Sequence, residues 1–173
     1  KQAVEFVGLR KQRFTLHHTS DKPGEATQGK SPSTGTKRIY LLRHGEGEHN
    51  AWRAAEFAAG RTPNAKRHNV GAWPAELHDP CLTAKGRADA SAAAASARAL
   101  PRPSLLVTSP MRRAVQTMDI AFSDALAAGV PAVAHELCRE AFHGQDPSVY
   151  DSRLGRDELA GLFPHVDFSE HVL

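Results

Sequence analysis

The chain has 173 residues, with 22 Lys and Arg against 19 Asp and Glu and a net charge of +3. This length allows one ordinary domain. Its two cysteines, Cys81 and Cys138, are too few for a disulfide-rich scaffold and lack the spacing of a metal-binding motif. No apolar run approaches the ~18 residues that a membrane-spanning helix needs. We therefore expect a cytoplasmic domain, although a chain that opens with Lys1 could have lost a targeting segment.

The N-terminal part of the chain differs in composition from the rest. Residues 1–38 hold eight Lys and Arg against three acidic residues, and residues 19–36 are rich in Ser, Thr, Gly and Pro. Such a segment buries too little apolar surface to offset the entropy lost on ordering. We predict a flexible basic leader over 1–36 and a domain over 37–173. The alternatives are a tail that binds nucleic acid or a membrane surface, or a transit peptide. We favour none of these alternatives, because no aromatic residues lie among the basic residues of the 19–36 segment.

The domain is predicted to alternate strands and helices. Short apolar runs favour strands, and helical spacing, Thr83 as a cap and Gly129 as a stop favour helices. The predicted strands are 38–42, 105–107 and 130–134, the helices are 50–59, 84–100 and 111–128, and residues 61–80 form an irregular excursion. This order predicts an α/β fold with a mainly parallel sheet covered by helices. Ligands of such sheets bind beyond the carboxyl ends of the strands.

Two predicted strand ends carry cationic side chains. Arg43 and His44 follow the first strand, and Arg112 and Arg113 follow the second at the start of a helix. Cations there oppose the helix dipole, at a cost of ~0.3–1 kcal/mol, unless an anion lies between them. Helix N-termini and guanidinium groups both bind phosphate. The pattern suggests a phosphate pocket, although a lone Arg-His pair is usually structural.

Five segments, in order, resemble the histidine phosphatase superfamily, which has the phosphoglycerate-mutase-like fold. Residues 43–50 (RHGEGEHN) resemble its RHG signature, and residues 105–117 (LLVTSPMRRAVQT) its Ser-Pro-x-x-Arg signature. Residues 79–86 (DPCLTAKG) are similar to its D-x-x-LT-x-x-G element. Residues 136–144 and 163–169 resemble a eukaryotic phosphoglycerate-mutase-like phosphatase subgroup. The resemblance implies a three-layer α/β/α fold and a phosphomonoester hydrolase.

The resemblance also implies roles for single residues. His44 would be the nucleophile, forming a phosphohistidine that water hydrolyses. Arg43 and Arg113 would clamp the phosphate oxygens, and Asn50 would add a contact. Glu140 would protonate the leaving oxygen and then activate water.

Three choices rest on spacing. Arg113 is preferred to Arg112 because the family places its arginine four residues after the serine. Glu136 is the alternative to Glu140 as the general acid. His49 is expected to pack locally, with substrate contact as the alternative. No cofactor and no metal is implied, and the histidines include no H-x-x-x-H pair.

The sequence departs from the family in one main respect. The family carries a second catalytic histidine on a late strand, and this chain ends at Leu173 without that motif. We expect a C-terminally truncated chain, lacking a strand and a helix, or a degenerate relative. Loss of one electrostatic group of this kind costs roughly 10²–10³ in rate. A lesser departure is Asp89, where family members often carry Gln.

The expected function is therefore a phosphatase with a phosphohistidine intermediate, acting on a phosphorylated small molecule or a phosphoprotein. A phosphate-binding pseudoenzyme or regulatory module is the first alternative. A phosphoglycerate-mutase-type phosphotransferase is the second. We expect no partnership with nucleic acid or membranes, and the sequence does not predict an oligomeric state.

Overall fold

The computed structural model describes residues 38–61, 74–140, 149–169 and 172. The chain divides into two units, 1–40 and 41–173, and every helix and strand described here belongs to the second. The helices are α1 (Glu48–Ala58), α2 (Ala84–Ala99), α3 (Arg112–Ala121), α4 (Ser123–Ala127) and α5 (Arg156–Leu162), with short 3-10 helices η2 (Ala75–Leu77), η3 (Glu136–Cys138) and η4 (Val149–Asp151). The strands are β1 (Leu106–Thr108), β2 (Ala132–Ala134) and β3 (Val166–Asp167). The predicted leader over 1–36 lies outside the described residues.

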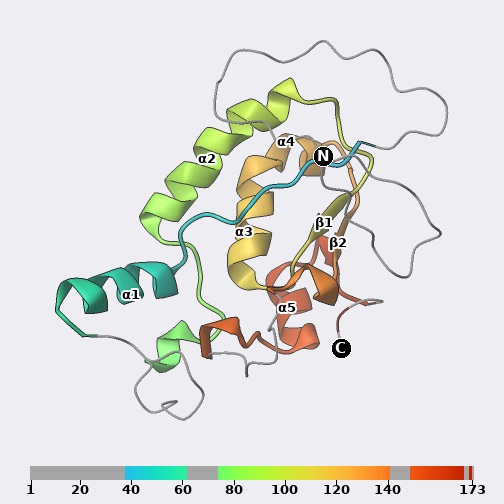
Figure 1. Ribbon diagram of the computed structural model, residues 1–173. Helices are drawn as coiled ribbons and strands as arrows, with labels where there is room; N and C mark the ends of the chain where they lie inside the picture. The colour runs from blue at the N-terminus through green and yellow to red at the C-terminus, as the bar shows by residue number, and fades with distance from the viewer. Residues whose placement is uncertain (1–37, 62–73, 141–148, 170–171, 173) are drawn as a thin grey trace, which may run out of the picture. The chain divides into compact units, whose positions relative to one another are not determined.

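The three strands form one parallel sheet in the order β1-β2-β3. Leu106 lies opposite Ala132, and Ala132 lies opposite Val166. Helices α3 and α4 connect β1 to β2, and α5 lies between β2 and β3 in the chain (Figure 1). The predicted α/β class with a parallel sheet is confirmed.

The core forms between the sheet and these connecting helices. Val115 of α3 and Leu159 of α5 are fully buried, and both belong to one apolar cluster with residues of all three strands. The buried members are Leu106, Val115, Met118, Val130, Ala132, Ala134, Leu159, Val166, Phe168 and Val172. The α3 helix contacts β1 along this cluster and packs against α2 with another face (Figure 1). The α3 N-terminus is thereby fixed where β1 ends.

The predicted strand over 38–42 is wrong. Residues 38–42 form no strand, and the side chain of Leu41 is 79% exposed. A strand needs a neighbour that accepts and donates its backbone hydrogen bonds. Among the described residues none pairs with this segment, so its apolar sequence alone does not make it a strand.

Three predicted helices are found, one of them in two pieces. The α1 helix begins two residues before the predicted start. The α2 helix matches its prediction, and Thr83 caps it by accepting from Gly86 N at 3.0 Å. The predicted helix over 111–128 breaks at Phe122, which leaves the helical region with φ −117° and ψ 24° and separates α3 from α4.

The predicted strands at 105–107 and 130–134 are present as β1 and β2, with bounds shifted by one or two residues. The sequence analysis predicted neither α5 nor β3. Of the irregular excursion over 61–80, residues 62–73 lie outside the described residues, and η2 occupies part of the remainder. No helix in the described part of the chain is long and apolar enough to cross a membrane.

Candidate active site

The His44 side chain is held in one orientation by its own backbone neighbour. Its Nδ1 atom lies 2.7 Å from the carbonyl oxygen of Gly45. Because a carbonyl only accepts hydrogen bonds, Nδ1 carries the proton and Nε2 is unprotonated and keeps its lone pair. Burial lowers the pKa of His44, and the positive charges of Arg113 and Arg43 lower it further. The imidazole is therefore neutral, with a nucleophilic nitrogen available near neutral pH.

Arg113 faces this nitrogen from the first turn of α3. Its Nε donates to Nε2 of His44 at 3.3 Å. The rest of the guanidinium is held from the other side, where one NH₂ group donates to the carbonyl of Tyr150 at 2.8 Å and the other contacts Asp151 at 3.4 Å. Arg113 is 4% exposed. A buried cation with fixed partners is preorganised to meet a phosphate oxygen beside His44.

Arg112 points to a different place. Its Nε donates to the carbonyl of Asp79 at 2.6 Å, and an NH₂ group donates to the carbonyl of His78 at 3.2 Å. The adjacent arginines therefore have different partners, and Arg113 is the one that lies against His44.

Four of the predicted site residues line one small cavity of about 220 Å³. They are Arg43, His44, Arg113 and Glu140, and the remaining lining residues are Ser109, Met111, Ala114 and Cys138. The two arginines give this cavity a positive wall beside the neutral imidazole. The hydrogen bond to the Gly45 carbonyl opposes the lowering of the His44 pKa, and the nearby carboxylate of Glu140 opposes it to a smaller extent.

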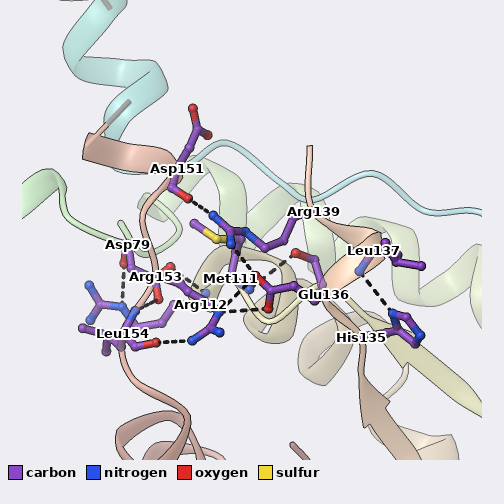
Figure 2. Close-up of polar contacts among 11 residues, drawn as sticks. Asp79, Met111, Arg112, His135, Glu136, Leu137, Arg139, Asp151, Arg153 and Leu154 are labelled. Atoms are coloured by element: carbon purple, nitrogen blue, oxygen red, sulfur yellow. Dashed lines mark hydrogen bonds and ion pairs between the residues drawn. The ribbon is translucent and has the colours of Figure 1, made fainter. Parts of the chain in front are cut away.

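The alternative acid, Glu136, is engaged elsewhere. It forms ion pairs with Arg139 and with Arg153, whose Nε lies 3.0 Å from a carboxylate oxygen. Figure 2 shows both guanidinium groups directed at this carboxylate. The Glu136 carboxylate is therefore occupied by two arginines, and Glu136 lines neither cavity. Glu140 lies exposed at the cavity instead.

Asn50 lies in a neighbouring cavity of about 400 Å³, which shares Arg43 and His44 with the smaller one. Its Oδ1 accepts from Gly47 N at 2.9 Å at the start of α1. The structure thus places Asn50 near His44 but in a different cavity from Arg113 and Glu140.

His49 is buried behind the site. Its ring stacks on Tyr150 with centroids 4.9 Å apart, and burial together with the charge of Arg113 lowers its pKa to about 3. It lines neither cavity. This placement fits the expectation of local packing.

The sequence analysis gave no role to several residues that support the site. Thr117 of α3 accepts from Gly45 N at 3.1 Å and donates to the carbonyl of Arg113 at 2.7 Å, which links the two signature segments. A Cβ on Gly45 would lie 2.5 Å from the carbonyl oxygen of Gly86, and one on Gly86 would lie 2.1 Å from that of Glu46. The His44 loop and α2 therefore approach more closely than any larger residue allows.

These features define a site for an anion that can react with nitrogen. A neutral imidazole nitrogen, a buried arginine beside it and an exposed carboxyl group share one cavity. The first can attack phosphorus, the second can neutralise developing charge and the third can move a proton. Among the described residues no group of three potential ligands could hold a metal ion.

The sequence model of the histidine phosphatase superfamily (branch 1) matches residues 39–148. The chain belongs to this superfamily, whose activity is in general of the phosphatase or mutase kind. No curated protein and no solved structure matches the chain.

Proposed function

We propose that the chain is a phosphomonoester hydrolase that transfers a phosphoryl group to Nε2 of His44 and then to water. One observation carries the proposal. The hydrogen bond from Nδ1 to the carbonyl of Gly45 leaves Nε2 unprotonated, and Nε2 faces Arg113. The lowered pKa of His44 supports it, because only the neutral ring can attack phosphorus.

In the first step the lone pair of Nε2 forms a bond to phosphorus and the bond from phosphorus to the leaving oxygen breaks. Glu140 gives its proton to that oxygen, and Arg43 and Arg113 bind the other phosphate oxygens. In the second step the Glu140 carboxylate takes a proton from water, whose oxygen attacks phosphorus. The P–N bond breaks, inorganic phosphate leaves and His44 is neutral again.

The substrate class we propose is a phosphorylated small molecule or a phosphoprotein, and the subgroup is that of the eukaryotic phosphoglycerate-mutase-like phosphatases. An exposed Glu140 favours hydrolysis over a mutase reaction, because a mutase must keep water away from its phosphoenzyme.

The test is to trap the phosphoenzyme. The chain is mixed with an aryl phosphate, quenched in base after milliseconds to seconds, and examined by mass spectrometry for an acid-labile phosphoryl group. We expect the label in the wild type and in His165→Ala, a control at an exposed histidine on the surface, and no label in His44→Ala. Turnover without a label, or a label that persists in His44→Ala, would falsify the proposal.

A phosphate-binding module without turnover is the second candidate. Within the described residues, His44 is the only histidine that lines either cavity. The family resemblance implies two catalytic histidines, so a site with one could bind phosphate without turning it over. Calorimetry with inorganic phosphate separates the two functions. Binding that depends on Arg113, with no label and no release of the aryl alcohol, would favour the module.

A further inference from the structure

Asp79 is an unusual residue with no part in the reaction as proposed. Its φ is +45°, in the left-handed region that residues other than glycine rarely adopt, and its side chain is completely buried. Both features cost free energy, so the surrounding structure must hold this residue in place. Burial raises the pKa of the Asp79 carboxyl group, and hydrogen bonds from two backbone N–H groups oppose that rise.

The two oxygens of Asp79 bind two different segments. Oδ1 accepts from Arg112 N at 2.9 Å, and Oδ2 accepts from Leu154 N at 3.2 Å (Figure 2). Arg112 is the first residue of α3 and the neighbour of Arg113. Leu154 follows the segment whose Tyr150 carbonyl and Asp151 carboxylate hold the Arg113 guanidinium. One carboxylate thus joins the backbone beside Arg113 to the segment that fixes its side chain.

The same loop continues to the His44 segment. Glu48 N donates to the carbonyl of Cys81 at 2.9 Å, and Thr83 N donates to the carbonyl of Glu46 at 2.9 Å. These bonds flank an antiparallel bridge between Gly47 and Leu82. Residues 79–83 therefore contact the Arg113 side of the site at one end and the His44 side at the other.

We propose that Asp79 is a positioning residue, which through its two backbone hydrogen bonds fixes the Arg113 guanidinium against Nε2 of His44. The inference deepens the proposed function and rests on it for its catalytic consequence. The positional claim itself concerns the resting chain and needs no substrate.

The pKa of His44 reports the position of Arg113. The positive charge of Arg113 lowers this pKa, so displacement of the guanidinium raises it. A direct effect of removing the negative charge of Asp79, with Arg113 unmoved, would have the opposite sign, because loss of a negative charge lowers the pKa of an imidazole. The sign of the change therefore distinguishes a positioning role from a direct charge effect.

The experiment is an NMR titration of the His44 ring in the full chain. Asp79→Asn is the main variant, since Asn suits a positive φ but presents an NH₂ group to one of the two N–H donors. Asp79→Gly is the second variant, because glycine relieves the backbone strain and favours folding. Asp124→Asn is the control, with the same charge change at an exposed carboxylate paired with Arg98. Arg113→Ala gives the value expected when the guanidinium is absent.

We expect the pKa of His44 to rise in both Asp79 variants toward its value in Arg113→Ala, and to stay unchanged in Asp124→Asn. The kcat/KM for an aryl phosphate should fall about 10²-fold, the size expected when a catalytic group is displaced by ~1 Å. An unchanged or lowered pKa in either folded variant overturns the inference. Loss of folding in both would also overturn it, since it would make Asp79 a residue of the fold rather than of the site.

The two proposals can fail separately. A wild type that forms no phosphohistidine refutes the proposed reaction, while the titration still decides whether Asp79 positions Arg113. If trapping succeeds and the pKa does not rise, the reaction stands without this role for Asp79.

Discussion

The ring of His49 stacks on that of Tyr150, with an angle of 16° between the two planes. The backbone carbonyl of the same tyrosine accepts from Arg113. The stack thus joins α1 to the segment that holds the arginine. Within the described residues Nδ1 of His49 has no hydrogen-bond partner, and the ring is 4% exposed.

This buried neutral ring should make the fold sensitive to acid. The pKa of His49 is about 3 in the folded chain, against an ordinary value of 6.5. Below 6.5 the unfolded chain therefore binds a proton that the folded chain does not, so the free energy of unfolding falls as the pH drops from 6.5 toward 3. By linkage, His49 alone should remove about 2 kcal/mol between about pH 8 and pH 5.

Urea denaturation at the two pH values measures this effect. His49→Phe keeps an aromatic ring against Tyr150 and removes the titrating group, so the loss of stability between the two pH values should shrink by about 2 kcal/mol. An equal loss in both chains would contradict the prediction.

The lowered pKa of His44 should appear in the pH dependence of the reaction. Protonation of Nε2 removes the lone pair, so kcat/KM should fall as the pH drops through the pKa of the free enzyme. Because burial and the two arginines lower that pKa, the acid limb should lie below 6.5. Arg113→Ala should move this limb to higher pH. A limb above 6.5 in the wild type would be inconsistent with the geometry.

The two glutamates should differ in how they affect the leaving group. Glu140→Gln removes the proton donor, so kcat/KM, which reports the transfer to His44 and not the later hydrolysis, should fall by about 10²–10⁴-fold for poor alkoxide leaving groups and hardly change for a nitrophenyl ester. Glu136→Gln deprives Arg139 and Arg153 of their shared carboxylate. The Glu136→Gln variant should have a lower melting temperature, and the dependence of its kcat/KM on the leaving group should equal that of the wild type. A series of aryl and alkyl phosphates, assayed with both variants, decides which glutamate is the acid.

The contact between the His44 loop and α2 should not tolerate a methyl group. Gly86→Ala places a Cβ 2.1 Å from the carbonyl oxygen of Glu46 and should abolish activity and lower the melting temperature. Gly161→Ala in α5 is the matched control, because a Cβ there meets nothing within 4 Å. That variant should be stabilised by about 0.5–1 kcal/mol, the usual gain from alanine inside a helix. Equal melting temperatures for the two variants would contradict the prediction that the His44 loop and α2 leave no room for a Cβ on Gly86.

Local signals predicted much of the fold. The cap at Thr83 and the alanine-rich run after it were sufficient for α2, and Gly129, with φ +77°, does end the segment after α4. The apolar run at 38–42 led to the wrong prediction of a strand, because strand formation also requires a partner strand elsewhere in the chain. The strand β3 has only two residues, too few to carry a period of their own.

The candidate site was partly predictable for a similar reason. His44 and Arg113 belong to short motifs, and the structure brings their side chains together. The support for Arg113 comes instead from the backbone carbonyl of Tyr150, and every residue carries such an oxygen. Asp79 acts on backbone N–H groups 33 and 75 residues away in the chain. The D-x-x-LT-x-x-G motif includes Asp79, but no side-chain pattern indicates which backbone groups that residue binds.

The close approach of Gly45 to Gly86 also restricts how this chain could have diverged. Each Cβ would collide with a peptide oxygen of the facing segment, an atom that persists through every possible substitution there. A replacement at either glycine therefore has no compensating replacement at the other. A side chain can replace either glycine only if the backbones of the His44 loop and α2 have first moved apart.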